Sequence, residues 1–363
     1  MLIRNNAPVF GASDTLPQQG RDWVFSFSYR GLTSDDHYSG TQFQYARKAN
    51  DTYVINTQQL YDLSATYFFD KRWSASLSLP IVNSTWAVPT PIAPLPAGDR
   101  AEQNSSGLGD LIVTGRVWTF DPEKHPRGNL SVGLGFKAPT GNYKVEDSYP
   151  NINGTNDAEK DVDMSIQPGD GGWGYLFDLQ GYMAWKRVSW YGSGSYLVNP
   201  RDTNDAESII VGLGFGGNPA FASRIENSVT DSYLLRTGVL FPVGTTKLGL
   251  NLGFRMEGLP RYDFVGDSHG FRRPGYETFL EPGFVYTIGR QTLSLYVPIG
   301  LVQNRRPDPY TGAPGDATFP EYIILAGYSY HFSPGGAPSR RPTLPPGETP
   351  LSDSPVTPPP ASR

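Results

Sequence analysis

Ten charged or amide residues recur in segments of this chain where apolar and polar residues alternate. A period of two places the polar residues on one face of a β-strand and the apolar residues on the other. Side chains of both signs around a narrow passage bind or steer ions. The ten residues are Asp110, Arg116, Lys137, Asp178, Arg236, Asn251, Arg255, Glu257, Glu277 and Glu281.

We do not expect these charged side chains to face lipid, because an Arg or Lys side chain that faces the middle of a bilayer costs about 2–4 kcal/mol. If the apolar faces contact lipid, the ten residues line a polar path through the interior. The alternative is a filled interior whose salt bridges only brace the wall. We expect Arg116 and Lys137 to oppose Asp178, and Arg255 to oppose Glu277 and Glu281.

A metal site has weaker support. The chain has no Cys and 4 scattered His, so thiolate and paired-histidine zinc sites are not expected. Clustered carboxylate oxygens suit Ca²⁺, and one acidic segment offers Asp157, Glu159, Asp161 and Asp163 at alternating positions. Because the segment lacks EF-hand spacing, an ordinary solvated loop is the favoured interpretation, and we expect no cofactor.

Catalysis also has little support in the sequence. A lipid-hydrolysing barrel would need a His and a Ser side by side on the wall that faces lipid. His331 has the opposite parity in its segment, and His37, His125 and His269 lie in expected connections. We therefore expect no enzyme activity.

Twelve segments with strand-like alternation must position these residues. Each needs only about 9–11 residues to cross a bilayer as a tilted strand, and no run reaches the roughly 18 apolar residues of a spanning helix. In each, one parity is apolar, as in Leu130, Val132, Leu134 and Phe136. The segments are Asp22–Arg30, Thr57–Phe69, Arg72–Ile81, Leu108–Thr119, Asn129–Ala138, Trp173–Trp185, Val188–Val198, Ser232–Val243, Lys247–Glu257, Tyr276–Ile288, Thr292–Val302 and Tyr322–Phe332.

The connections between these segments alternate in length. Short ones, such as Asp70-Lys71 and Lys186-Arg187, take turns with long ones, such as Gly31–Asn56 and Pro139–Gly172. Short periplasmic turns and long extracellular loops are typical of outer-membrane barrels, whereas a soluble β-sandwich has no reason to alternate its connections. We predict an all-β chain in which residues 22–332 form a single closed antiparallel transmembrane β-barrel of about 12 strands.

One further segment complicates the count of strands. Glu207–Phe215 also reads as a strand, with Ile209, Val211 and Leu213 in step. If it crossed the membrane, the later short turns would lie outside the cell. We therefore expect it in or under the long loop Asn199–Asp231, with a thirteenth or fourteenth strand as the alternative.

Large aromatic residues lie at or near the ends of the predicted strands. Amphipathic rings prefer the headgroup layer of a bilayer, so we expect an aromatic girdle there. Ordinary core aromatics are the alternative. The girdle candidates are Trp23, Trp73, Trp118, Trp173, Trp185, Trp190 and Phe332.

The net charge and the chain ends bear on location and partners. A net charge of -5 gives no basic surface for nucleic acid. Met1–Phe10 lacks the apolar core of a secretory signal, so no signal peptide is visible. We expect residues 1–21 to be the periplasmic lead-in of a mature or start-trimmed chain, with a cytoplasmic protein as the alternative. The Pro-rich residues 333–363 are expected to be disordered and to reach toward the periplasm, the cell wall or a partner.

Two glycine-rich strings carry a resemblance to a known family. Ser106–Arg116 reads SGLGDLIVTGR and Leu130–Gly141 reads LSVGLGFKAPTG. They resemble the paired motifs of the outer-membrane family named for the meta-cleavage pathway of phenol degradation, as do Leu77–Pro80 and the closing Phe332.

The resemblance covers most of Asp22–Phe332. It implies an outer-membrane channel or transporter-like barrel that contacts lipid and lipopolysaccharide and passes small solutes, with hydrophobic or aromatic compounds inferred from the pathway. It carries no agreed site residues. A plugged structural or adhesive surface barrel, and a soluble β-sandwich binding protein, remain as alternatives.

Overall fold

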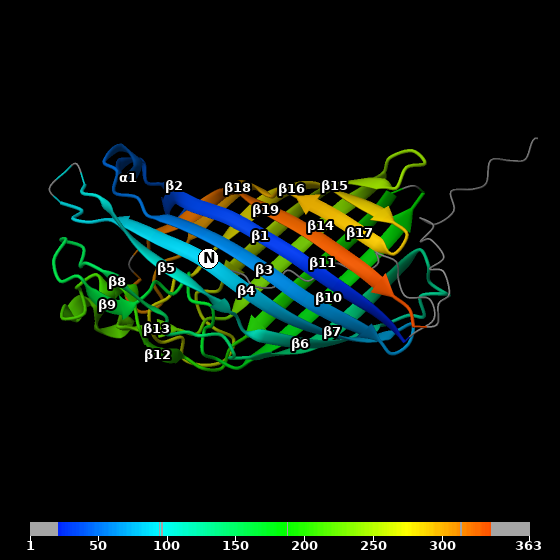
Figure 1. Ribbon diagram of the computed structural model, residues 1–363, viewed down its shortest axis with the longest axis horizontal. Coiled ribbons are helices and arrows are strands. Elements are labelled where there is room, and N and C mark those ends of the chain that lie inside the picture. The colour runs from blue at the N-terminus through cyan, green and yellow to red at the C-terminus, as the bar shows by residue number, and fades with distance from the viewer. Residues whose placement is uncertain (1–20, 94, 96, 187, 313, 335–363) are drawn as a thin grey trace, which may run out of the picture.

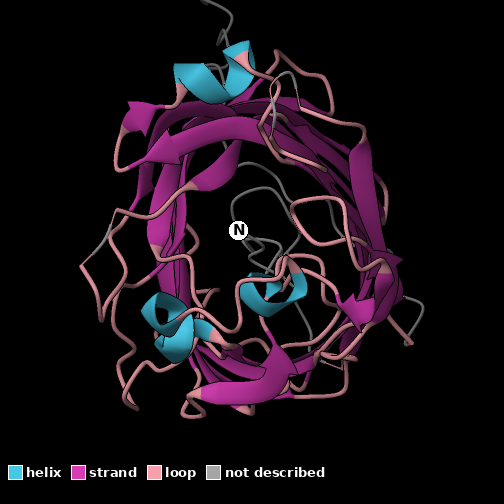
Figure 2. Ribbon diagram, turned by 90° about the vertical axis from the view of Figure 1, so that its left-hand side faces the viewer, coloured by secondary structure: helices cyan, strands magenta, loops and turns pink. Residues whose placement is uncertain are grey.

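A computed structural model describes residues 21–93, 95, 97–186, 188–312 and 314–334. The expected lead-in, except for Arg21, and all but the first two residues of the expected Pro-rich tail lie outside these residues. The described chain is a long, closed barrel, and Figure 2 shows its strands as a ring seen from the end that carries the long loops.

The barrel has twelve strand positions, as the sequence predicts. Two positions are shared by pairs of strands. β17 and β18 lie end to end between β16 and β19, and β5 and β6 lie end to end along β4, where β6 also pairs with β7. In order around the barrel, the strands are β1 (Asp22–Ser39), β3 (Ile55–Phe68), β4 (Trp73–Pro89), β5 (Arg100–Leu108) with β6 (Leu111–Trp118), β7 (Gly128–Ala138), β10 (Gly174–Trp185), β11 (Val188–Val198), β14 (Ser232–Pro242), β15 (Leu248–Leu259), β16 (Gly275–Ile288), β17 (Gln291–Tyr296) with β18 (Ile299–Arg305), and β19 (Ala317–Phe332).

Closure of the sheet excludes the sandwich alternative. The last strand, β19, pairs antiparallel with the first, β1, from Trp23 opposite Phe332 to Tyr38 opposite Ala317. All barrel pairings are antiparallel, and each of the twelve strand positions lies next to the position that precedes it in the chain. A closed ring has no sheet edge that could leave backbone groups unpaired in lipid.

Alternation within the strands separates the two faces of the wall. In β7, Leu130, Val132 and Leu134 are exposed on the outside, whereas Ser131 and Lys137 are buried on the inside. A wall that is apolar outside and polar inside suits a barrel surrounded by lipid. The closed barrel therefore belongs in the outer membrane.

Several strands are longer than the sequence indicates. The segments Gly31–Ser39, Val82–Pro89, Arg100–Gly107 and Ala317–Glu321, expected in loops, belong to β1, β4, β5 and β19. Their residues are largely polar, so hydropathy does not mark them as strand. Backbone pairing between neighbouring strands holds them in the sheet, as from Ile81–Leu108 to Pro89–Arg100 in β4 and β5.

The long loops fold together at one end of the barrel (Figure 1). They contain β2 (Gln42–Phe43), α1 (Tyr45–Ala49), the hairpin of β8 (Glu146–Tyr149) and β9 (Ala158–Asp161), β12 (Thr203–Glu207), α2 (Ile209–Gly212), the 3-10 helix η1 (Pro219–Arg224) and β13 (Glu226–Ser228). A small apolar core joins Trp86, Tyr149, Ile166, Ile209 and Phe271 from three of the barrel's connections and the loop-side end of β4. No helix in the described ranges is long and apolar enough to cross a membrane.

The ambiguous segment Glu207–Phe215 lies in the connection between β11 and β14, as expected, and forms no barrel strand, so the alternative of a thirteenth or fourteenth strand is wrong. Ile209–Gly212 is a helical turn, and Ile209 packs in the loop core. Gly212 lies against Tyr149, where an added Cβ would meet the phenol oxygen at 2.1 Å. Tertiary packing therefore overrides the local alternation of apolar residues.

Candidate functional site

All ten sequence-predicted interior residues are buried inside the barrel, each at most 8% exposed. They come from β6, β7, β10, β14, β15 and β16, apart from Asp110, which lies between β5 and β6. Their parity is opposite to that of the apolar outer residues. The interior is thus rich in buried charge of both signs. The role of these ten residues in the passage of solutes is a proposal.

One group of charges joins β1 to the β14–β16 wall. Arg30 donates to Glu257 with both terminal nitrogens, at 3.0 Å for Nη1 to Oε2. Arg255 Nε donates to the same Oε2 at 2.7 Å, and Arg236 Nε donates to Glu281 Oε1 at 3.1 Å. Buried charges need such partners.

The pairing in this group differs in part from the sequence-based expectation. Arg255 does face Glu281, with Nη1 3.8 Å from Oε2, but its closer partner is Glu257. Its described ion pairs do not include Glu277, which instead lies opposite Glu257 in the register of β15 and β16. Sequence analysis missed Arg30, although its parity opposite Phe25, Phe27 and Tyr29 marks it as inward.

A second ion pair lies on the opposite side of the barrel. Arg116 Nε donates to Asp178 Oδ1 at 2.7 Å, as expected, and it passes over Gly133 on the intervening strand β7. A Cβ on Gly133 would lie 3.0 Å from both side chains. The expected partnership of Lys137 with Asp178 is wrong, because Lys137 pairs with Asp170 and lies 3.9 Å from Asp110.

The two glycine-rich strings contact each other where the longest loop, between β7 and β10, joins the wall. Asp110 accepts hydrogen bonds from the backbone N–H groups of Gly141 at 3.0 Å and Asp170 at 3.1 Å, near the two ends of that loop. Thr140 Oγ1 donates to the Gly109 carbonyl at 3.0 Å. The strings therefore fix how the loop leaves and re-enters the wall.

A cavity of about 200 Å³ lies between the wall and the folded loops. Strand residues at its surface, such as Lys137 and Phe319, lie near the loop-side ends of their strands. Loops contribute Asn199 and Arg273, and Trp86 comes from β4. Sequence analysis did not predict this cavity, because loop residues far apart in the chain form much of it.

Two loop carboxylates near the cavity are held ionised by positive charge. Burial opposes the charge on Asp163, but Arg273 outweighs it by donating to both carboxylate oxygens at 2.8 and 2.5 Å, so the pKa lies below the ordinary value. The pKa of Asp316 is likewise lowered despite its burial, because His37 and Arg47 donate to its oxygens. Both ion pairs fasten loops to one another or to the wall.

The girdle candidates do not all lie outside. Trp73, Trp173, Trp185, Trp190 and Phe332 are exposed on the outer surface, and Trp23 is partly exposed and tilts against Tyr67. Trp118 is 5% exposed and packs edge-on against Tyr182 inside the barrel. Its inclusion in the girdle is wrong, since it shares the inward parity of Arg116.

The acidic segment does not gather into a calcium site, the weaker of the two interpretations that its sequence offered. Asp163 is bound by Arg273, Asp161 accepts a bond from the Glu207 backbone at 2.7 Å, and Asp157 and Glu159 are exposed. The described residues that bring three potential ligand atoms within 4.8 Å of one another are Asp202, Asp267 and His269.

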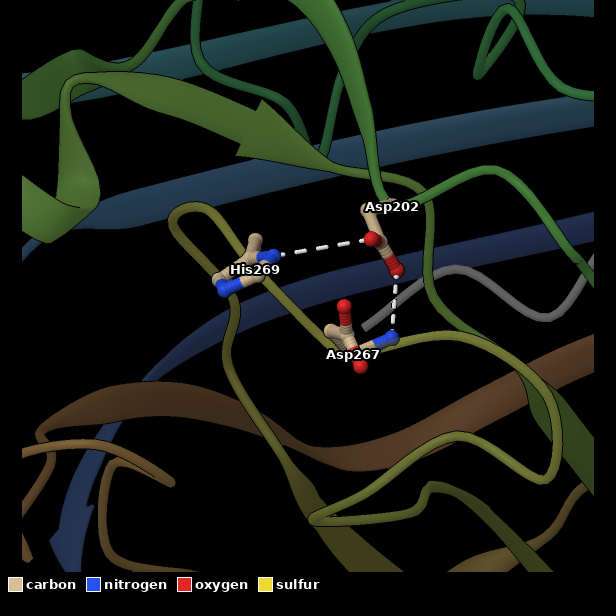
Figure 3. A group of neighbouring side chains, drawn as sticks. All are labelled: Asp202, Asp267 and His269. Atoms are coloured by element: carbon tan, nitrogen blue, oxygen red, sulfur yellow. Dashed lines mark hydrogen bonds and ion pairs between the residues drawn. The ribbon is translucent and has the colours of Figure 1, made fainter.

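Figure 3 shows this group on neighbouring loops. Asp202 Oδ1 already accepts backbone bonds from Asp267 at 2.8 Å and Ser268 at 3.2 Å, and Oδ2 lies 3.5 Å from His269 Nδ1. Asp267 and His269 are exposed. The contacts of Asp202 account for the shape of the turn without a metal ion.

The contacts of His331 do not resemble a hydrolytic site. Its Nε2 lies 3.3 Å from Asp22, and Ser333 Oγ donates to the other oxygen of that carboxylate at 2.6 Å. The serine thus bonds the acid and not the imidazole, whereas nucleophilic catalysis requires a base beside the nucleophile. His331 is also buried on the inner face and not on the lipid side.

No protein-family model matches the sequence, and no curated protein matches it either. Among solved structures, the chain is similar to an outer membrane channel from Pseudomonas putida F1, with 14% identity, a TM-score of 0.57, and coverage of 90% of this chain and 100% of that one. It is less similar to the translocator domain of the autotransporter NalP from Neisseria meningitidis, with 12% identity over 89% of this chain and 92% of that one and a TM-score of 0.42.

The CymD monoaromatic hydrocarbon channel gives 10% identity over 87% of this chain and 89% of that one, with a TM-score of 0.36. At 14% identity, the similarity to the Pseudomonas putida F1 channel shows the outer-membrane barrel fold alone. The narrower family suggested by the glycine-rich strings stays a prediction.

Proposed function

We propose that this barrel is an outer-membrane channel through which small solutes pass passively. The observation that carries the proposal is the interior of the closed wall, which contains buried charges of both signs and, at the loop end, a cavity of about 200 Å³. A purely structural barrel has no need of a cavity lined by polar side chains. The similar Pseudomonas putida F1 protein is an outer membrane channel.

The cavity supports small, partly apolar solutes. Trp86 and Phe319 present aromatic surface, while Asn199, Arg273 and Arg305 present polar groups. Ligand sites commonly combine apolar walls with a few placed polar groups. The resemblance of the glycine-rich strings to the phenol-degradation family favours aromatic compounds small enough for this cavity.

The ten interior residues are proposed to set which ions and solutes pass. Apart from Glu277, the charged residues among them lie in ion pairs within the described chain, so positive and negative groups stand side by side and form no single-sign ring. We propose no catalytic role for any of them. The outward aromatic residues are proposed to contact lipid and lipopolysaccharide, and residues 333–363 to contact the periplasm or cell wall.

Conductance tests the channel directly. The full chain, refolded and inserted into planar bilayers, is expected to give discrete current steps, and liposomes containing it should take up small solutes faster than protein-free liposomes. Correctly folded protein that gives neither current steps nor solute flux would rule the channel out.

A plugged structural barrel is the second candidate, and the Arg30–Glu257 pair favours it. This contact joins strands that are four positions apart around the ring, so it spans part of the interior. If it blocks passage, replacing Arg30 and Glu257 together with Ala should turn a silent barrel into a conducting one. A channel that already conducts should change only its step size.

A further inference from the structure

One buried arginine lacks the partner that the others have. Five of the six buried arginines in the described chain form an ion pair with a carboxylate, whereas the sixth, Arg305, forms none within the described ranges and is only 4% exposed. The five pairs are Arg30 and Arg255 with Glu257, Arg236 with Glu281, Arg116 with Asp178, and Arg272 with Asp263.

Main-chain contacts hold Arg305 in place at the loop-side end of β18. Its Nη1 donates to the carbonyl oxygens of Pro274 at 2.9 Å and Arg306 at 2.6 Å, and its Nη2 donates to that of Arg272 at 3.2 Å. Gly315 leaves room for the guanidinium, because a Cβ there would lie 2.5 Å from Cζ. The cation is therefore positioned without a neutralising charge in contact.

Burial of a cation without a counter-ion is unfavourable. Carbonyl dipoles compensate for part of this cost. The positive charges of Arg273 and Arg224 also act on Arg305 and oppose the effect of the Asp308 and Asp316 carboxylates, neither of which forms an ion pair with it. Lys137, another cation at the cavity, differs in that Asp170 pairs with it directly. An anion beside Arg305 would supply what the protein does not.

Arg305 lines the same cavity as Trp86 and Phe319, both of which are buried aromatics. The cavity has about 200 Å³, and an apolar protein cavity of about 150 Å³ accommodates benzene. A single ring with one small substituent therefore fits. The walls provide apolar contact. On Arg305, Nη1 already donates to two carbonyl oxygens, whereas Nε has no hydrogen-bond partner among the described residues and lies beside Nη2, so the Nε–Nη2 edge of the guanidinium is the one that can donate to a carboxylate.

We propose that the cavity binds a small organic carboxylate, with its charge against Arg305 and its apolar part against Trp86 and Phe319. This inference rests on the proposed channel function and names the solute class of the same cavity. Benzoate is a suitable probe, and benzyl alcohol, which has a similar ring but no charge, is its neutral control.

Calorimetric titration of the full chain in detergent tests the site. Wild-type protein should bind benzoate about tenfold more tightly than benzyl alcohol, since hydrogen bonds to charged groups contribute more than neutral ones. Arg305→Gln should weaken benzoate binding about tenfold and leave benzyl alcohol unchanged. Arg305→Lys should retain part of the preference, because it keeps the charge.

Arg306→Gln is the matched control, because Arg306 is the next residue and is exposed. Equal binding of the two probes by wild-type protein would overturn the proposal, as would unchanged benzoate binding by folded Arg305→Gln. Should that variant fail to fold, the comparison of the probes in wild type and in Arg305→Lys decides. If the protein conducts but does not prefer benzoate over benzyl alcohol, the carboxylate site is wrong and the channel proposal stands. If it prefers benzoate but does not conduct, the channel proposal is wrong and the binding site stands.

Discussion

The guanidinium of Arg30 on β1 donates to both carboxylate oxygens of Glu257 on β15, four strand positions away around the barrel. Both side chains are fully enclosed, and Arg255 bonds the same carboxylate. Glu257 is thus the common acceptor for two buried cations. Contacts across a closed wall of this kind resist deformation of the ring.

Replacing Glu257 should destabilise the barrel strongly. Glu257→Gln leaves Arg30 and Arg255 without their shared carboxylate, and breaking a buried ion pair costs about 3–5 kcal/mol. Urea unfolding of the barrel in lipid vesicles measures this cost. Arg30→Met with Glu257→Gln should recover part of the loss, and equal stability of the single variant and wild type would contradict the prediction.

Ion preference should respond to the interior arginines. Arg116→Gln and Arg255→Gln each remove a positive charge from the interior, so the preference of the channel should shift toward cations. Reversal potentials across a salt gradient measure the shift. Arg340→Gln, in the Pro-rich segment, should leave them unchanged. Unchanged potentials in both interior variants, with conductance retained, would make Arg116 and Arg255 wall braces.

Acid should loosen the loops through Asp163. Its pKa is lower in the folded protein than the ordinary value because of Arg273, so its contribution to stability is complete above the unfolded pKa of about 3.9 and is lost as pH falls through the folded value. Hydrogen exchange of residues 158–170, corrected for intrinsic rates, should therefore rise relative to the barrel strands below about pH 4.

Asp163→Asn should raise this exchange about tenfold at pH 7 and remove its dependence on acid, because the bonds to Arg273 lose their charge. Asp205→Asn is a suitable control, since Asp205 forms an exposed pair with Arg201. A pH response that persists in Asp163→Asn would assign it to another group.

Gly141→Ala should release the loop between β7 and β10. An added Cβ would lie 2.8 Å from the backbone of Gly169 and 3.0 Å from that of Gly109, and overpacking of this kind costs about 1–3 kcal/mol. Limited proteolysis should cut the loop faster while the barrel stays folded. Gly217→Ala has nothing within 4 Å of its added Cβ and should behave as wild type.

The sequence by itself determined the wall of this protein. Alternation in segments such as Leu130–Phe136 fixes which side chains face lipid, because a strand repeats every two residues and the bilayer penalises exposed charge. The same parity places Lys137 and Arg255 inside. The same parity also marks Arg30 and Trp118 as inward. Arg30 was overlooked because it is the last residue of the predicted first strand, and Trp118 was misassigned because Trp prefers membrane interfaces.

Only the tertiary structure decided which of the expected interior ion pairs form. Arg116 reaches Asp178 because Gly133 has no side chain between them, whereas Lys137 lies near the loop and pairs with Asp170. Arg305 has no carboxylate partner among the described residues, and alternation could not show this because its contacts come from the loop residues Arg272 and Pro274. Parity decides whether a side chain faces the inside or the outside of the barrel. The distances between side chains depend on their positions along the barrel axis, on strand tilt and on loop packing.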